Sequence, residues 1–205
     1  MITRILQELT CYKINKIILH KKMIKVDKWT KEHVVKFLKE VGIKKGDIIF
    51  DCCCGEGNYT LPAAEITNKN GMVYAMDMNK NKLDTLKKKS NLENLINIKI
   101  IEKEFKKIMP LPDKSIDMVL LYDIFSYFSI NDMRLSILLG EVYRILKDNG
   151  LISVYPEHVD TDKLKQKIIN ANFRLDKELF DTIIHDNNIK KGYIWNFRKV
   201  RKALK

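Results

Sequence analysis

The amino-acid sequence predicts an α/β fold in which a mostly parallel, doubly wound sheet carries helices on both faces. Short apolar segments of strand length alternate along the chain with longer segments of helical character. The first apolar run ends at Asp51 and leads into the turn Gly55-Glu56-Gly57, and a second run ends at Asp77. Alternation of this kind is typical of a parallel sheet, because parallel strands need crossover connections between them.

Each predicted element rests on its local pattern. Thr30 is a residue type that caps helices, Gly42 stops the first helix, and Pro62 is tolerated because it falls in a first helical turn. The predicted strands are short apolar runs, as a buried sheet requires. We expect helices at Thr30–Val41, Tyr59–Ile66, Asn79–Lys89, Asp132–Leu146 and Thr161–Ala171, and strands at Ile48–Asp51, Met72–Asp77, Ile98–Ile101, Ile116–Tyr122, Leu151–Tyr155, Phe173–Phe180 and Gly192–Val200.

The length of 205 residues fits one α/β domain with an N-terminal extension. We expect the domain to span residues 29–205. Residues 1–28 should form a partly amphipathic helical extension that covers the active site, packs on the sheet edge or pairs with a second subunit. No apolar run approaches the roughly 20 residues of a membrane span, and Arg4 and Glu8 interrupt the apolar residues of the N-terminus. The sequence therefore predicts a cytoplasmic protein.

The turn after the first strand distinguishes two kinds of nucleotide site. A pyrophosphate-binding turn continues to a third small residue, and none follows Gly57 at the required spacing. Asp51 and Glu56 should repel a pyrophosphate but tolerate a ligand that carries a sulfonium and an ammonium group. Asp77 lies 20 positions after Gly57, a spacing that places a carboxylate on ribose hydroxyls, although capping of the next helix explains it equally well. Together these features favour S-adenosylmethionine as the ligand.

Longer motifs occur in an order that is typical of one enzyme family. Residues 44–47 form a polar, glycine-containing lead-in to the first strand. Residues 110–121 combine a proline turn with S-x-D and an apolar run, and residues 141–147 form the helix before the fifth strand. In these motifs the chain resembles class I S-adenosylmethionine-dependent methyltransferases, most closely the type 11 group that includes ubiquinone and menaquinone biosynthesis enzymes. The resemblance covers nearly the whole chain. It implies a Rossmann-like, seven-stranded sheet with an antiparallel last strand, and methyl transfer to a small-molecule acceptor.

The resemblance also implies which residues hold the cofactor. Cys53 stands where the family has its first loop glycine. Glu104 and Phe105 are nearest to the family's adenine-binding Asp, although Glu104 could equally be a solvated surface residue. The turn at residues 148–150 replaces the family's Pro-Gly-Gly, which the tolerance of Asn for a left-handed backbone allows. The expected cofactor-binding residues are Asp51, Cys53, Gly55, Gly57, Asp77, Met78, Glu104, Phe105 and Tyr122.

The methyl acceptor should bind beside the cofactor, at the carboxyl ends of the fourth and fifth strands, where ligands of parallel sheets gather. A sulfonium is already an activated electrophile, so the enzyme has mainly to position a nucleophile and exclude water, and no catalytic base is assigned. Asp123 is also explained as a cap, and His158 as a surface histidine. The candidates for the substrate pocket are Asp123, Ser126, Tyr155 and His158. Glu157, which lies between the last two in the sequence, could face the same pocket.

The basic composition supports a second class of function, a nucleic-acid methyltransferase, because the formal net charge is +12. Two motifs of such enzymes are missing. The Asn/Asp-Pro-Pro-Tyr/Phe motif of amino-group methyltransferases does not follow the fourth strand, and no cysteine occurs after Cys54 to serve as a cytosine-C5 nucleophile. A cofactor-binding protein that transfers no methyl group is a third class.

The four cysteines do not form a metal-binding pattern. Cys52, Cys53 and Cys54 are consecutive, and neighbouring side chains of a strand point to opposite faces. Cys11 is distant in the sequence, and no C-x-x-C pair occurs. We therefore predict neither a structural metal nor a disulfide.

Overall fold

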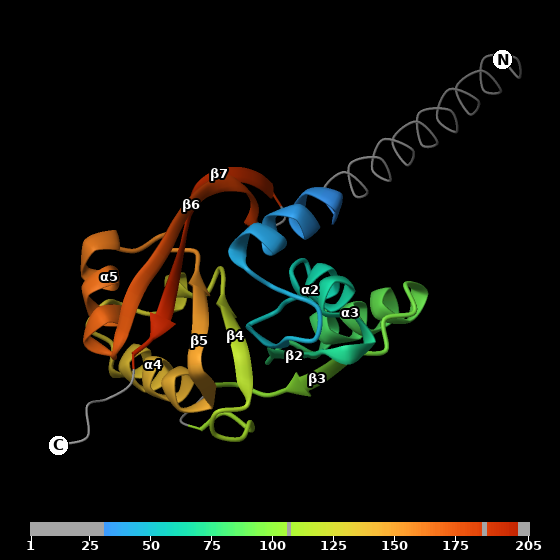
Figure 1. Ribbon diagram of the computed structural model, residues 1–205, viewed down its shortest axis with the longest axis horizontal. Helices are drawn as coiled ribbons and strands as arrows, with labels where there is room; N and C mark the ends of the chain where they lie inside the picture. The colour runs from blue at the N-terminus through green and yellow to red at the C-terminus, as the bar shows by residue number, and fades with distance from the viewer. Residues whose placement is uncertain (1–30, 106–107, 186–187, 201–205) are drawn as a thin grey trace, which may run out of the picture.

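A seven-stranded sheet with the strand order β3-β2-β1-β4-β5-β7-β6 forms the centre of the fold. The computed structural model describes residues 31–105, 108–185 and 188–200 (Figure 1). Strands β1 to β5 pair in parallel, whereas β7 is antiparallel to both of its neighbours, which confirms the predicted sheet. The strands are β1 (Ile48–Cys52), β2 (Met72–Asp77), β3 (Ile98–Glu102), β4 (Ile116–Leu121), β5 (Leu146–Val154), β6 (Phe173–His185) and β7 (Asn188–Lys199).

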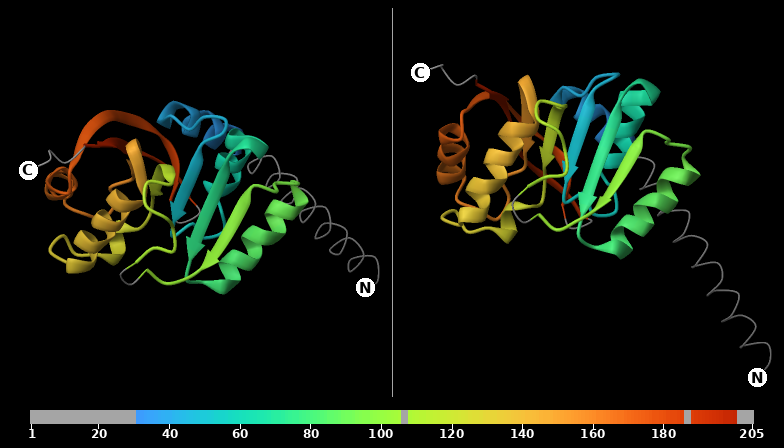
Figure 2. Two further views of the ribbon diagram at one scale, coloured as in Figure 1. Left: turned by 60° about the horizontal axis from the view of Figure 1, so that its bottom comes forward. Right: turned by 90° about the horizontal axis from the view of Figure 1, so that it is seen from below.

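Helices cover both faces of the sheet, as the alternation of elements predicts (Figure 2). They comprise residues 31–41, α2 (Thr60–Thr67), α3 (Lys80–Leu92), α4 (Met133–Ile145) and α5 (Thr161–Asn170). Neighbouring strand residues face opposite ways, so Ile49 packs in the cluster formed with the helix at 31–41, whereas Phe50 packs in the cluster formed with α4 and α5. The helix at 31–41, α2 and α3 therefore share one face, and α4 and α5 share the other.

Strand β5 begins earlier than the sequence predicts. The helix expected at Asp132–Leu146 ends at Ile145, and the expected turn at residues 148–150 lies inside β5. The reason is that Ile116 of β4 pairs with Leu146, and the register then shifts before Met118 pairs with Leu151. Asn149, with φ of 67°, absorbs this irregularity through the left-handed backbone that Asn tolerates.

Strands β6 and β7 form a hairpin that is longer than predicted. The expected strands Phe173–Phe180 and Gly192–Val200 extend to His185 and begin at Asn188, and cross-strand pairing continues to that end of the hairpin. The added length curves over the helix at 31–41 (Figure 1). Contacts to two other elements explain it, because His33 Nε2 lies 3.0 Å from the Thr182 carbonyl oxygen and the Tyr59 hydroxyl binds Ile184.

The predicted extension at residues 1–28, together with Cys11 and the Thr30 cap, lies outside the described residues. None of the helices in the described part of the chain combines the length and the apolar composition of a membrane-spanning segment. The cytoplasmic location stays a prediction.

Candidate functional site

The loop between β1 and α2 is tied directly to the end of β2. The Gly55 amide donates to Asp77 Oδ2 at 2.9 Å, and the Asn79 amide donates to Asp77 Oδ1 at 2.8 Å. Asn79 itself caps α3 by accepting a hydrogen bond from the Lys82 amide. Asp77 therefore orders the start of the helix and also holds the loop. Each carboxylate oxygen keeps capacity for a further donor, as a ribose hydroxyl would require.

The two glycines of the loop differ in what surrounds them. Gly57 has φ of 88°, and a Cβ built on it would overlap the end of the Leu86 side chain of α3, so a side chain at this position would force Leu86 to shift. Gly55 has φ of 56°, and a Cβ there would meet nothing nearer than Lys82 Cδ at 4.0 Å. Gly57 thus serves helix packing, whereas Gly55 leaves backbone open to a ligand.

Cys53 has an unusual backbone conformation for a residue with a side chain. Its φ is 63°, in the left-handed region that favours glycine, and its side chain is exposed. The structure thus supplies a physical reason for a glycine at this place in related loops. Its neighbours Cys52 and Cys54 are buried. Burial and then the nearby Asp51 raise the pKa of the Cys54 thiol, which keeps it protonated.

Asp51 is a buried carboxyl group at the end of β1. It is 3% exposed and accepts a hydrogen bond of 2.6 Å from the Thr60 hydroxyl at the start of α2. Burial raises the pKa of Asp51 to about 7, the Thr60 hydrogen bond opposes this shift, and the charge of Asp77 adds to it. A cation arriving at the loop would favour the ionised form.

The remaining predicted cofactor residues follow the strands β2, β3 and β4. Met78 follows Asp77 and is 69% exposed, and Glu104 and Phe105 follow β3, with Glu104 exposed and Phe105 half-buried. Tyr122 is buried, and its hydroxyl lies 2.6 Å from Ser153 Oγ. The Tyr122 side chain is thus part of the core, and the cofactor contacts of all four residues stay predictions.

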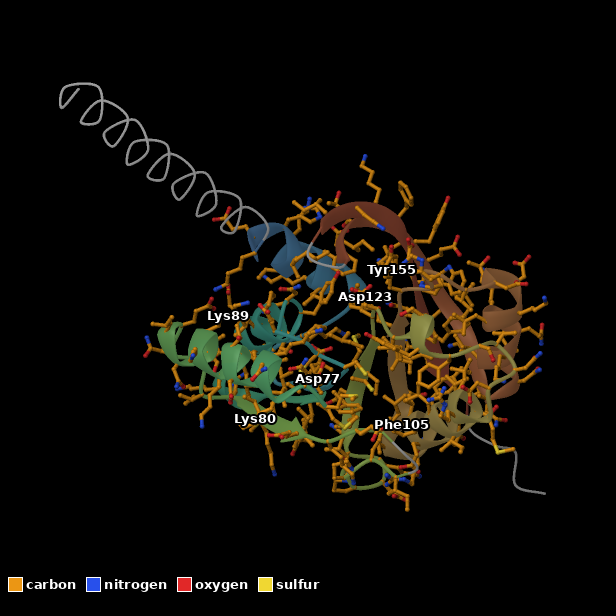
Figure 3. All side chains as sticks on the ribbon, turned by 180° about the vertical axis from the view of Figure 1, so that it is seen from behind. Asp77, Lys80, Lys89, Phe105, Asp123 and Tyr155 are labelled. Carbon is orange, nitrogen blue, oxygen red and sulfur yellow. The ribbon has the colours of Figure 1, made fainter. Side chains whose placement is uncertain are left out.

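The predicted substrate-pocket residues separate into two groups. Asp77, Asp123 and Tyr155 follow one another from the α3 side of the sheet towards the hairpin (Figure 3). Asp123 is half-buried, with φ of 56°, and its charge contributes to the raised pKa of Tyr155. Ser126 and His158 are exposed. Geometry therefore brings Asp123 and Tyr155 together, and the binding roles of all four stay predictions.

A cavity of about 430 Å³ opens beside Tyr155. The Tyr155 hydroxyl donates to Glu157 Oε2 at 2.6 Å, and both residues line the cavity. Burial and then Glu157 raise the pKa of Tyr155, so the phenol stays protonated and Glu157 is the acceptor. The other lining residues come from the segment after β5, the α5 start and the β6–β7 hairpin: Pro156, Thr161, Glu178, Phe180, Lys191, Gly192, Tyr193 and Trp195.

Sequence reasoning missed the contribution of the hairpin to this cavity. Phe180 and Tyr193 are cross-strand partners whose ring centroids lie 4.9 Å apart, and each is more than half exposed. Gly192 permits the packing, because a Cβ there would lie 2.8 Å from Tyr155 Cε2. The aromatic content of residues 193–197 indicated a strand but not its partner, and the exposed pair depends on that pairing.

Comparison with known proteins identifies a methyltransferase domain and the same fold. A family model described as "Methyltransferase domain" matches residues 43–198. Demethylmenaquinone methyltransferase of Lactobacillus johnsonii is 31% identical over 140 residues, which cover 68% of this chain and 56% of that protein. The Listeria welshimeri protein of the same name is 27% identical over 172 residues, covering 82% of this chain and 66% of the relative. The chain spans about half to two thirds of the length of these relatives.

Among solved structures, a SAM-dependent methyltransferase from Aquifex aeolicus is similar with a TM-score of 0.63 and 20% sequence identity. The similarity covers 80% of this chain and 88% of that one. At this identity the likeness is one of fold, and it extends over most of both chains.

Proposed function

The chain belongs to the family of class I S-adenosylmethionine-dependent methyltransferases, and from this premise we propose that it transfers the methyl group of S-adenosylmethionine to a small-molecule acceptor. One observation carries the proposal: the open backbone of Gly55 is tied to the Asp77 carboxylate, which has capacity for two more donors. This combination suits a nucleoside with two ribose hydroxyls.

The residues at the loop fit the charged cofactor. Asp77 would accept hydrogen bonds from the ribose, and the exposed Met78 would cover one face of the adenine. Near the end of β1 stands the acidic Asp51 and not a cationic side chain, which agrees with a ligand that carries positive charge. Glu104 or the backbone of Phe105 would accept the adenine amino group. When bound, the cofactor supplies an electrophilic methyl group.

The remaining work of the chain is to hold the acceptor and exclude water. The cavity beside Tyr155 has the dimensions of a small-molecule site and offers exposed aromatic rings together with the Glu157 carboxylate. Glu157 is placed to accept a hydrogen bond or a proton from an acceptor hydroxyl. The names of the relatives, demethylmenaquinone methyltransferases, support an acceptor with an aromatic ring.

Two measurements test the proposal. Titration calorimetry with S-adenosylhomocysteine should give one-site binding, and no binding would remove the cofactor assignment. A methyl-transfer screen with labelled cofactor should include hydroxynaphthalenes, small thiols, metalloids and bulk RNA. We expect incorporation into the ring compounds. Incorporation into RNA alone would establish the nucleic-acid function instead.

A further inference from the structure

The Tyr59 hydroxyl group fastens the hairpin that lines the cavity to the cofactor loop. Tyr59 stands two residues after Gly57 and is the residue before α2. Its hydroxyl donates to the Ile184 carbonyl oxygen at 2.9 Å and accepts from the Ile184 amide at 2.9 Å. The Tyr59 hydroxyl thus forms hydrogen bonds with both the carbonyl oxygen and the amide of Ile184, near the end of β6.

The ring of Tyr59 is held firmly, so the hydroxyl has a defined position. Tyr59 is 7% exposed, and its ring centroid lies 4.7 Å from that of Tyr122 and 6.4 Å from that of Phe37. The Ala63 amide donates to the Tyr59 carbonyl oxygen, and the Leu61 amide donates to that of Gly57. A displacement of the loop backbone at residue 57 would therefore be transmitted to Tyr59 and the start of α2.

The same hairpin forms the far wall of the cavity. Phe180 lies four residues before Ile184 on β6, and its partner Tyr193 lies on β7. Because twelve cross-strand pairs join β6 to β7, the two strands move together. The path from loop to cavity consists of Gly57, Tyr59, Ile184 and Phe180, each joined to the next by covalent structure or a hydrogen bond.

We propose that Tyr59 is a positioning residue that couples the two halves of the site, so that cofactor binding at the loop orders the β6–β7 hairpin and with it the acceptor cavity. The inference rests on the proposed function, because it requires that the loop binds the cofactor. Coupling of this kind is reciprocal, so an acceptor held by the hairpin would in turn strengthen cofactor binding. Cofactor binding should make local opening of the β6–β7 hairpin rarer, and the rate of amide hydrogen exchange measures this opening.

Hydrogen exchange measured by mass spectrometry tests the coupling without any acceptor. The probe is S-adenosylhomocysteine at saturation, and the readout is the change in exchange of peptides from residues 173–184 and 189–196. In the wild type we expect the probe to slow exchange about twofold to tenfold, the range that the net strength of one hydrogen bond corresponds to. In Tyr59→Phe, which keeps the ring, the probe should still bind, but this slowing should disappear.

Tyr143→Phe is the matched control. The Tyr143 hydroxyl donates to the Val200 carbonyl oxygen at 2.9 Å, so this variant also removes one tyrosine hydroxyl from a backbone bond at the opposite end of the hairpin. It should retain the slowing. If the wild-type hairpin does not respond to bound probe, or if Tyr59→Phe responds as the wild type does, the coupling is wrong while cofactor binding stands. If calorimetry detects no probe binding to the wild type, the proposed function and the coupling fall together.

Discussion

The buried Asp51 carboxyl should make the stability of this protein depend on pH in a way that one substitution removes. Its pKa of about 7 compares with an ordinary value of 3.8, mainly because burial disfavours the charged form. One pKa unit corresponds to about 1.4 kcal/mol, so the shift of roughly three units corresponds to about 4 kcal/mol. Asp51→Asn keeps the shape of the side chain and cannot ionise.

The sign follows from the raised pKa. Between about pH 4 and pH 7 the folded protein holds the Asp51 proton more tightly than the unfolded chain does. The stabilisation is fully present below about pH 4 and is lost as the pH rises through about 7. The free energy of unfolding of Asp51→Asn, relative to wild type, should therefore rise by about 4 kcal/mol over this range. Urea unfolding at several pH values measures it, and parallel curves for the two proteins would refute the reasoning.

The ionisation of Asp51 should also be measurable when the cofactor binds. A ligand with ammonium and sulfonium charges favours ionised Asp51, so below about pH 7 binding should release up to one proton. Calorimetry in buffers of different ionisation enthalpy measures this release. In Asp51→Asn the release should be absent, and an unchanged proton count in the variant would place the cation away from Asp51.

Further substitutions address the rest of the loop and the acceptor. Asp77→Ala should weaken binding of S-adenosylhomocysteine by about 1 to 3 kcal/mol in calorimetry, because ribose hydroxyls lose their acceptor, and unchanged affinity would remove Asp77 from the site. Gly57→Ala should lower the free energy of unfolding by about 1 to 3 kcal/mol, because its φ of 88° disfavours a side chain and because the new methyl group would overlap Leu86 of α3. Gly140→Ala, where a Cβ would meet nothing within 4 Å, should not destabilise, and equal losses would contradict the packing argument. Cys53→Val should be about 1 to 2 kcal/mol less stable than Cys53→Gly in urea unfolding, because a side chain resists a left-handed backbone, and equal stability would show that φ of 63° costs nothing. RNA binding in filter assays should vanish between low and moderate salt, and tight RNA binding that persists, with methyl incorporation, would overturn the small-molecule acceptor.

The structure of the loop and strand ends proposed to hold the cofactor was predictable because its signals are local. The run that ends at Asp51, the glycines at 55 and 57, and Asp77 lie within thirty residues of one another in the sequence. The structure places them on adjacent strands, since β1 pairs with β2. Periodicity and turn residues were sufficient for this region, where each strand is followed at once by its helix.

Tyr155 and Glu157 were candidates from the sequence, but the hairpin wall of the proposed acceptor cavity could not be predicted in the same way, because it depends on contacts between distant residues. Tyr59 binds Ile184 across 125 positions, and the exposed Phe180–Tyr193 pair exists only through the register of the hairpin. The predicted start of β5 at Leu151 was wrong for a similar reason, because pairing with Ile116 extends the strand back to Leu146. Patterns within a strand do not specify its partner or its register.

This division explains why the sequence indicates the cofactor more clearly than the acceptor. In the proposed function, the loop and Asp77 would recognise a ligand whose ribose and charges do not vary, so the cofactor alone would constrain the residue types at these positions. Much of the cavity wall comes from β6 and β7, which join the described sheet through β5. That hairpin can change its exposed side chains without disturbing the strands that hold the loop. Tyr59 joins the two regions, so we expect the acceptor to be determined by residues on the hairpin side of this contact and the cofactor by residues on the other.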